Sequence, residues 1–375
     1  MQALDVTVPV VALQFNVPVG EGDDLPQNLR TRMGYLASDC LKAMETALGD
    51  LSTASMGRVL HFTADVVCSG GFALWQRFCY EYAIDHIGLA SIRIFYYLRA
   101  RFKDLEAEFN RLPDEDFYRS GIIQRRIAEI MLVLQGSPRR GKVKMPAVPA
   151  ETHRNQNWLL GSRRAPDSAV VRRIFNRSTD MPELAAATNE MLHACTEGAI
   201  ERSLFWMKWI MEEDAALRKE TGGGLTSTER GGQKGKNSVA YFLMVACVEA
   251  YKELAAKGAV RMNEEIQALV ELFKSTSSPL TSRRKLDLLV IMLQVLVEVP
   301  KWRVPAAQPV VKDPTVLARA TEQAPTFFGE VLLKAAPRKT IKKVAAPRKK
   351  KGGQQTALEQ RLAAFDTMMM NVGTG

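Results

Sequence analysis

The stretch ALWQRFCYEYAIDHIGLASIRIFYYL, residues 73–98, contains the pattern that decides the fold of this chain. Its apolar residues recur at spacings of three and four, which is typical of a helix that buries one face. Gly88 interrupts the pattern, and a glycine inside a helix costs about 1 kcal/mol relative to alanine. We therefore expect two helices that meet near Asp85 to Ser91, with Asp85 capping the second helix.

The charge of the chain is concentrated at its C-terminal end. The 375 residues carry a net charge of +10, and residues 334–375 hold ten Lys and Arg against two acidic residues. The preceding residues therefore carry only +2. This asymmetry predicts an anionic partner for the tail. We rank nucleic acid above a membrane surface as that partner.

The spacing of the cysteines and the hydropathy of the chain indicate its cellular compartment. The five cysteines are widely separated and include no CxxC pair. This pattern predicts reduced, buried thiols in an intracellular protein. The N-terminal residues lack the basic region of a signal peptide, and no apolar run reaches the roughly 18 residues that span a bilayer. We expect a soluble chain with no membrane partner, located in the nucleus or in a viral replication compartment.

Helical periodicity continues along most of the chain, after a short strand at about residues 10–17. A start signal at residues 23–26 predicts a first helix that ends near Gly49. We predict an all-α fold with two helical bundles in tandem and a disordered basic C-terminal tail. The predicted parts are an N-terminal extension (1–25), a first helical domain (26–140), a surface linker (141–180), a second helical domain (181–305) and a flexible tail (306–375) with a short terminal helix.

The two predicted helical domains contain similar features in the same order. Each has a helix with Arg, Leu and an aromatic residue, then a helix with Cys and Glu, then an apolar helix that runs into a proline and a basic residue. The matched residues are Arg58, Leu60 and Phe62 with Arg202, Leu204 and Trp206, Cys79 and Glu81 with Cys247 and Glu249, and Pro138 and Arg139 with Pro300 and Lys301. Their separations of 144, 168 and 162 residues indicate a tandem repeat with one long insertion. The alternative is a pair of unrelated bundles.

Known catalytic and metal-binding motifs are poorly matched. Gly136, Gly141 and Lys142 fit part of a phosphate-binding loop, but Val143 stands where Ser or Thr would hold magnesium. The four histidines are scattered without ligand spacing. We therefore predict no catalytic residue, no metal and no cofactor, and a protein that is not an enzyme.

The basic tail is the strongest candidate for a binding site. Lysine and arginine side chains neutralise phosphates without reading bases, although a nuclear targeting signal has the same composition. A basic cluster at residues 139–142 is a second candidate for contact with the nucleic-acid backbone. The predicted nucleic-acid-binding residues are Lys334, Arg338, Lys339, Lys342, Lys343, Arg348, Lys349, Lys350, Lys351, Arg139, Arg140 and Lys142.

An aromatic cluster at Phe205, Trp206 and Trp209 allows two interpretations. Exposed aromatic rings stack on bases in proteins that bind single-stranded nucleic acid. A stripe at helical spacing is more typical of a buried core, and we favour the core.

The segment WQRFCYEYAIDHIGLAS, residues 75–91, resembles a part of the RarA/MgsA family of clamp-loader-related ATPases in replication and recombination. SLFWMKWIM, residues 203–211, and residues 127–139 are similar to neighbouring helices of that family. The resemblance implies helical bundles that are like clamp-loader collars and mediate assembly. The chain has no intact Walker motif, so the ATPase activity is not implied.

These observations lead to two hypotheses about function. The first is a non-enzymatic accessory scaffold of DNA replication or repair, with collar-like domains that bind protein partners or a second copy and a basic tail that binds nucleic acid, DNA in the first place. The alternative is a structural protein that condenses or packages nucleic acid in a viral particle.

Overall fold

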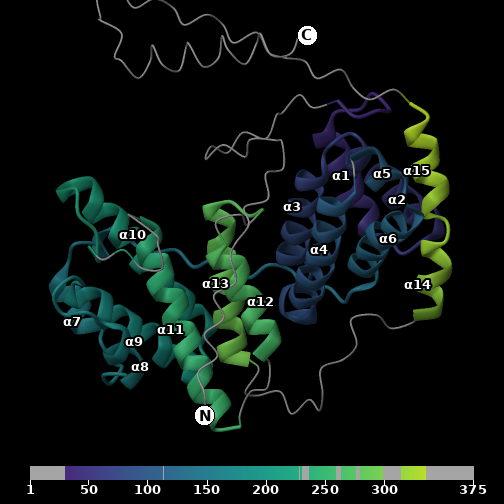
Figure 1. Ribbon diagram of the computed structural model, residues 1–375. Coiled ribbons are helices and arrows are strands. Elements are labelled where there is room, and N and C mark those ends of the chain that lie inside the picture. The colour runs from purple at the N-terminus through teal and green to yellow at the C-terminus, as the bar shows by residue number, and fades with distance from the viewer. Residues whose placement is uncertain are drawn as a thin grey trace, which may run out of the picture. The chain divides into compact units, whose positions relative to one another are not determined.

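The computed structural model describes residues 30–112, 114–227, 229, 236–258, 263–275, 279–298 and 314–334. Every regular element in these ranges is a helix, which confirms the all-α prediction (Figure 1). The predicted strand at residues 10–17, the terminal helix and most of the basic tail lie outside the described residues.

The helices of the described ranges fall into two groups and a final pair along the chain. The first group is α1 (Ala37–Leu48), α2 (Thr53–Cys68), α3 (Phe72–Tyr82), α4 (Arg93–Arg111), α5 (Asp114–Arg119) and α6 (Gly121–Gly136). The second group is α7 (Gln156–Ser162), α8 (Ala169–Ile174), α9 (Pro182–Thr196), α10 (Ile200–Thr221), α11 (Lys236–Ala256), α12 (Asn263–Lys274) and α13 (Ser282–Glu298). Two short helices complete the series, α14 (Pro314–Thr321) and α15 (Ala324–Leu332).

The first helix begins later than its sequence pattern predicts. Residues 30–36 form a turn in which the Thr31 amide donates to the Tyr35 carbonyl at 2.9 Å. Gly34 occupies this turn with a φ of +91°, a conformation that favours glycine. The turn interrupts the apolar period, and α1 therefore starts at Ala37.

The predicted linker at residues 141–180 contains regular structure. Its helices α7 and α8 place Leu159 and Val170 in the core, 5% and 3% exposed. Glu190 of α9, which is 1% exposed, accepts hydrogen bonds from the amides of Arg164 and Ala165 at 2.5 and 2.6 Å. A buried carboxylate thus holds the connection between the two short helices in place, and no local period reveals this contact.

Two sets of five helices repeat the same packing. We call α1, α2, α3, α4 and α6 the first repeat, and α9, α10, α11, α12 and α13 the second repeat. In both repeats the first helix packs on the second, third and fifth, the second packs on the third and fifth, and the third and fourth each pack on the fifth. This correspondence supports the tandem repeat that the sequence predicts. The two repeats belong to one compact unit of the chain.

The helices α14 and α15 follow one another end to end along the surface of the first repeat, although sequence analysis places them in the flexible tail. They pack against α2, α5 and α6 (Figure 1). Phe328 and Val331 are 1% and 0% exposed, and Ala324 packs with Leu60 and Leu132. The prediction of a tail without regular structure is therefore wrong for residues 314–334. Burial against the first repeat stabilises helices that are too short to form alone.

Candidate functional site

The centre of the candidate site is the break between α3 and α4, residues 83–91, which we call the Gly88 joint. A π-helix, Ala83–Ile87, extends α3, and the Gly88 amide donates to the Ala83 carbonyl at its end. Gly88 has a φ of +48° and a ψ of −127°, which a residue with a Cβ rarely adopts. A 3-10 turn, Gly88–Ser91, then leads into α4. The predicted interruption at Gly88 is thus confirmed.

Asp85 does not cap the second helix as predicted. The residue that precedes α4 is Ile92, and no side chain caps this helix. The wider π-turn instead directs the carboxylate of Asp85 toward the second repeat. π-turns of this kind occur often at functional sites.

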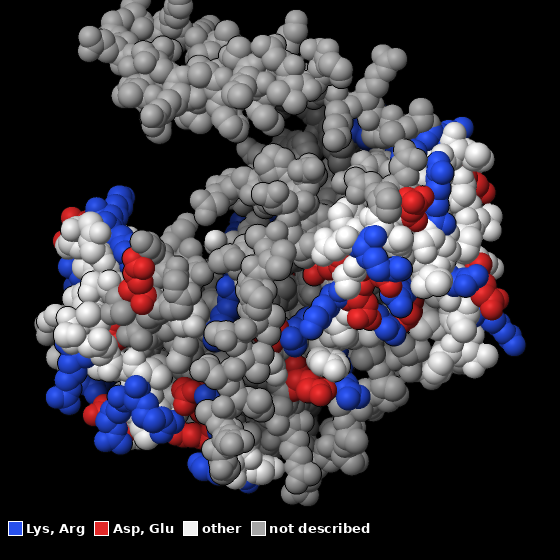
Figure 2. All heavy atoms as spheres, viewed as in Figure 1, with Lys and Arg blue, Asp and Glu red and all other residues white. Residues whose placement is uncertain are grey.

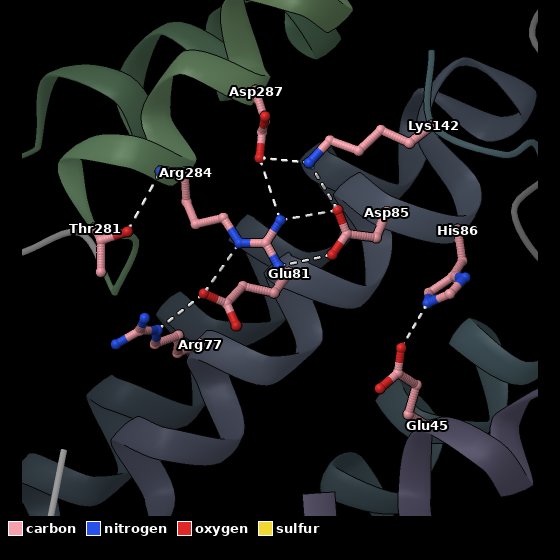
Figure 3. A network of polar contacts seen from close by, with 9 residues as sticks. All are labelled: Glu45, Arg77, Glu81, Asp85, His86, Lys142, Thr281, Arg284 and Asp287. Atoms are coloured by element: carbon pink, nitrogen blue, oxygen red, sulfur yellow. Dashed lines mark hydrogen bonds and ion pairs between the residues drawn. The ribbon is translucent and has the colours of Figure 1, made fainter. Parts of the chain in front are cut away.

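A network of alternating charges fastens the joint to α13 (Figure 3). The guanidinium of Arg284 donates two hydrogen bonds to Asp85, at 2.9 and 2.7 Å. Its Nε lies 3.4 Å from the Glu81 carboxylate. The Lys142 ammonium lies 3.2 Å from Asp85 and 2.8 Å from Asp287. We call these five residues the joint network.

Charge in the joint network shifts the pKa of its members. Partial burial by itself raises the pKa of the Asp85 carboxyl, but hydrogen bonds and positive charge from Arg284 and Lys142 outweigh this effect and lower the pKa. The hydrogen bonds from Arg284 to Asp85 raise the pKa of the guanidinium in turn. Both side chains are therefore charged at neutral pH, and the contact between Asp85 and Arg284 is a true ion pair.

Further ion pairs connect α4 of the first repeat with α12 of the second. Nε of Arg93 lies 3.3 Å from the Glu265 carboxylate, and Arg99 pairs with Glu271. The side chain of Glu265 is 8% exposed, so this pair is partly desolvated. The contact between the two repeats is consequently rich in charge, as contacts between independently stable parts of a chain often are.

A small cavity lies beside the joint network. Gly88, Lys142, Val290 and Gln294 are among its lining residues, and its volume is about 20 Å³. This space holds one water molecule and is far too small for a nucleotide. The cavity therefore offers no support for the partial phosphate-binding motif at Gly136, Gly141 and Lys142.

The predicted basic cluster at residues 139–142 contacts groups of the chain itself. Arg139 donates to the carbonyls of Leu48 and Gly49 at the end of α1. Arg140 forms two hydrogen bonds with the Glu298 carboxylate, at 2.7 and 2.8 Å. Lys142 belongs to the joint network. All three side chains thus have internal partners, each on a different part of the chain.

The remaining predicted contacts belong to the basic tail. Lys334 is exposed, and its carbonyl accepts a hydrogen bond of 3.0 Å from Arg32. The eight predicted cations from Arg338 to Lys351 lie outside the described residues. On the described surface that Figure 2 shows, basic and acidic side chains are interspersed.

The aromatic cluster belongs to the core, as the sequence favours. Trp206 and Trp209 are 4% and 1% exposed. Trp158 of α7 packs on both rings, at centroid distances of 5.6 and 6.0 Å. Buried rings are not accessible for stacking on bases.

Sequence reasoning missed Arg284 and Asp287 as members of the site. One signal was present, because Arg283, Arg284 and Lys285 occupy the first turn of α13. Cations are unfavourable at a helix N-terminus, where the dipole is positive. Their presence there indicates acidic partners elsewhere in the chain. The apolar periodicity of the sequence does not identify these partners.

No described helix is long and apolar enough to cross a membrane. Among the described residues, no group of three or more His, Cys, Asp or Glu residues is arranged to hold a metal ion.

Comparison with protein-family models, with curated proteins and with solved structures gives no match to this chain. The resemblance to the RarA/MgsA family therefore has no support beyond the residues on which it was based.

Proposed function

We propose that this chain is a non-enzymatic, nucleic-acid-binding scaffold of DNA replication or repair. Its basic segment, residues 334–351, binds phosphates, and its two helical repeats bind protein partners or a second copy. The setting in replication or repair rests on the sequence resemblance alone. The nucleic-acid binding rests on the observation that follows.

The observation that carries the proposal is the uneven distribution of charge along the sequence. Residues 334–351 contain nine Lys and Arg and no Asp or Glu. In contrast, the cations at residues 139–142 contact carboxylates and carbonyls of the chain. The basic segment thus has no acidic residue within its own sequence to compete with phosphate. Contacts of this kind are independent of base sequence.

Anisotropy of a fluorescent duplex DNA provides the test. If nine phosphates are contacted, the logarithm of the association constant falls with the logarithm of salt concentration with a slope of about −8. Substitution of the nine cations by Gln in the full chain is expected to remove both the binding and the slope. The control variant carries Gln at Arg125, Lys219 and Lys257, three exposed cations outside the segment, and should bind like the parent. Equal binding by the nine-substitution variant would refute the proposal.

The second candidate, a protein that condenses or packages nucleic acid in a viral particle, uses the same basic segment. It is favoured by the sequence-independent character of such contacts, which suits coverage of a whole nucleic acid. Abundance in purified particles distinguishes the candidates. A packaging protein is stoichiometric with the nucleic acid, whereas a replication accessory is absent from the particle.

A further inference from the structure

The segment between α7 and α9 carries an excess of positive charge. Residues 163–177 contain five Arg and one acidic residue, Asp167. They include α8 and the turns on either side of it. In Figure 2 basic side chains gather at the lower left of the described surface, where Figure 1 shows α7 and α8. This charge lies outside the basic segment and outside the cluster at residues 139–142.

Carboxylates of the chain neutralise only two of these five arginines. Arg163 lies 3.6 Å from the Asp167 carboxylate, and Arg173 lies 2.7 Å from that of Glu253. The other three arginines are exposed, and their side chains form no hydrogen bond or ion pair within the described part of the chain. We call them the arginine platform: Arg164, Arg172 and Arg177.

The acidic residues of the helices that pack against α8 have other partners. These helices are α9 and α11. On α9, Glu183 accepts a hydrogen bond from the side chain of Gln156, and Glu190 accepts from two backbone amides of the connection between α7 and α8. On α11, Glu253 is paired with Arg173, and Glu249 lies 2.7 Å from the Lys252 ammonium. The platform thus has no internal carboxylate available, and a phosphate meets no such competitor there.

Buried polar side chains hold the backbone that carries the platform. Glu190 fixes the amides at the first arginine, and Asn189 accepts a hydrogen bond of 3.0 Å from the Ser168 amide, between the first and the second. Asp180, which is 5% exposed, accepts a hydrogen bond of 2.8 Å from the amide of Asn176, the residue before the third. Satisfied networks of this kind make a surface rigid. The three arginines therefore extend from backbone in defined positions.

We propose that the arginine platform binds the phosphate backbone of a nucleic acid. A guanidinium group forms two parallel hydrogen bonds with one phosphate, which suits contact with a surface of fixed shape. The basic segment has seven Lys and two Arg, and an ammonium group acts as a point charge without a preferred orientation. The platform orients the nucleic acid that the basic segment attracts. Because three phosphate contacts are weak alone, this role rests on the proposed function.

An anionic membrane is a poorer fit to the same arginines. Helices that lie in a membrane interface present an apolar face to the lipid. The apolar residues Val170 and Val171 of α8 are instead 3% and 2% exposed, because they pack in the core. Leu160 of α7 is exposed, but a single apolar side chain is normal on a protein surface. The charge is therefore presented without the apolar surface that membrane insertion needs.

Anisotropy of a fluorescent duplex DNA with the full chain tests the platform. Gln at its three positions is expected to make the slope of the logarithm of the association constant against the logarithm of salt less steep by about three. Binding at about 100 mM salt should weaken by about tenfold or more. Lys at the same positions keeps the charge and should keep the slope, with weaker binding than the parent.

The matched control removes three other exposed cations, all on the first repeat, and should bind like the parent. It carries Gln at Lys42, Lys103 and Arg125. If circular dichroism shows that the triple platform variant loses helix, the three single Gln variants replace it, and each should change the slope by about one. A folded platform variant with the affinity and slope of the parent would overturn the proposal.

The nine-substitution variant of the basic segment separates this inference from the proposed function. If that variant loses binding while the platform variant binds like the parent, the platform is refuted and the proposed function stands. The opposite result refutes the basic segment and supports the platform, and a parent that does not bind DNA refutes both. Binding to vesicles of phosphatidylserine and phosphatidylcholine that only the platform variant loses, with DNA binding unchanged, would assign these arginines to a membrane and also overturn the proposal.

Discussion

Asp85 and Arg284 lie 199 residues apart in the sequence and form an ion pair with two hydrogen bonds, at 2.7 and 2.9 Å. The carboxylate is presented by a π-turn of the first repeat and the guanidinium by the first turn of α13 in the second. The two repeats are therefore joined where regular helical geometry is interrupted. This relationship leads to the first two predictions.

A double-mutant cycle measures the strength of this pair. We expect Asp85→Asn and Arg284→Gln each to lower the free energy of unfolding, with a coupling energy of roughly 1–3 kcal/mol at low salt, because both side chains are partly buried and share one network. The same cycle on Glu108 and Arg111, an i, i+3 pair on α4, should give about 0.2–0.5 kcal/mol. Urea denaturation checks both values, and equal coupling in the two cycles would contradict the prediction.

The pH dependence of stability follows from the lowered pKa of Asp85. Partial burial raises this pKa, but Arg284 and Lys142 lower it by a larger amount. A carboxyl with a lowered pKa in the folded state stabilises the fold above its unfolded pKa of about 3.9, and the effect is lost as pH falls through the folded pKa. The stability difference between the parent and Asp85→Asn should thus be full near neutral pH and shrink in acid. Thermal unfolding at a series of pH values measures it, and a difference that grows in acid would have the wrong sign.

Gly88→Ala tests the backbone of the joint. A Cβ at Gly88 meets no atom within 4 Å, so the cost arises from the positive φ alone. We expect a loss of about 1–3 kcal/mol in the free energy of unfolding. Gly121→Ala at the start of α6, where the Cβ also has open space and φ is not positive, serves as the control and should be neutral or stabilising. Denaturant titration of the two variants separates backbone strain from the general effect of adding a methyl group.

The cysteines should be unreactive in the folded chain. All five are free and buried, and burial raises the pKa of Cys195 to about 12. Because the thiolate is the reactive form, we expect slow reaction with a thiol reagent at neutral pH and rapid reaction of all five in denaturant. A stoichiometric fast phase in the native protein would locate an accessible thiol and contradict this burial.

The sequence predicts the helices well and their partners poorly. The interruption at Gly88 follows from local period and glycine, and it is confirmed. The repeat is also visible in the sequence, because matched residues keep their order. The predicted role of Asp85 as a helix cap was wrong. A π-turn changes the direction of a side chain, and the spacing of apolar residues in the sequence does not reveal such a turn.

The helices α14 and α15 at residues 314–334 were missed for a different physical reason. These helices are short and follow a proline-rich stretch, so a window along the sequence contains little period. Their stability comes from Leu60 and Leu132 on the first repeat, which are distant in sequence. The same limitation applies to Glu190. Local sequence patterns do not predict its hydrogen bonds with two backbone amides of the predicted linker.

The position of α14 and α15 has a consequence for synthesis of the chain. The first repeat is complete when residue 136 has been made, but the second of the two helices that cover α6, α15, ends only at residue 332. At about 5–20 residues per second, the ribosome needs roughly 10–40 s to make the intervening segment. During this time the apolar face around Leu132 waits without its final cover. Several nascent chains on one messenger RNA therefore expose the apolar face of α6 at the same time, before α14 and α15 of any of them have been made.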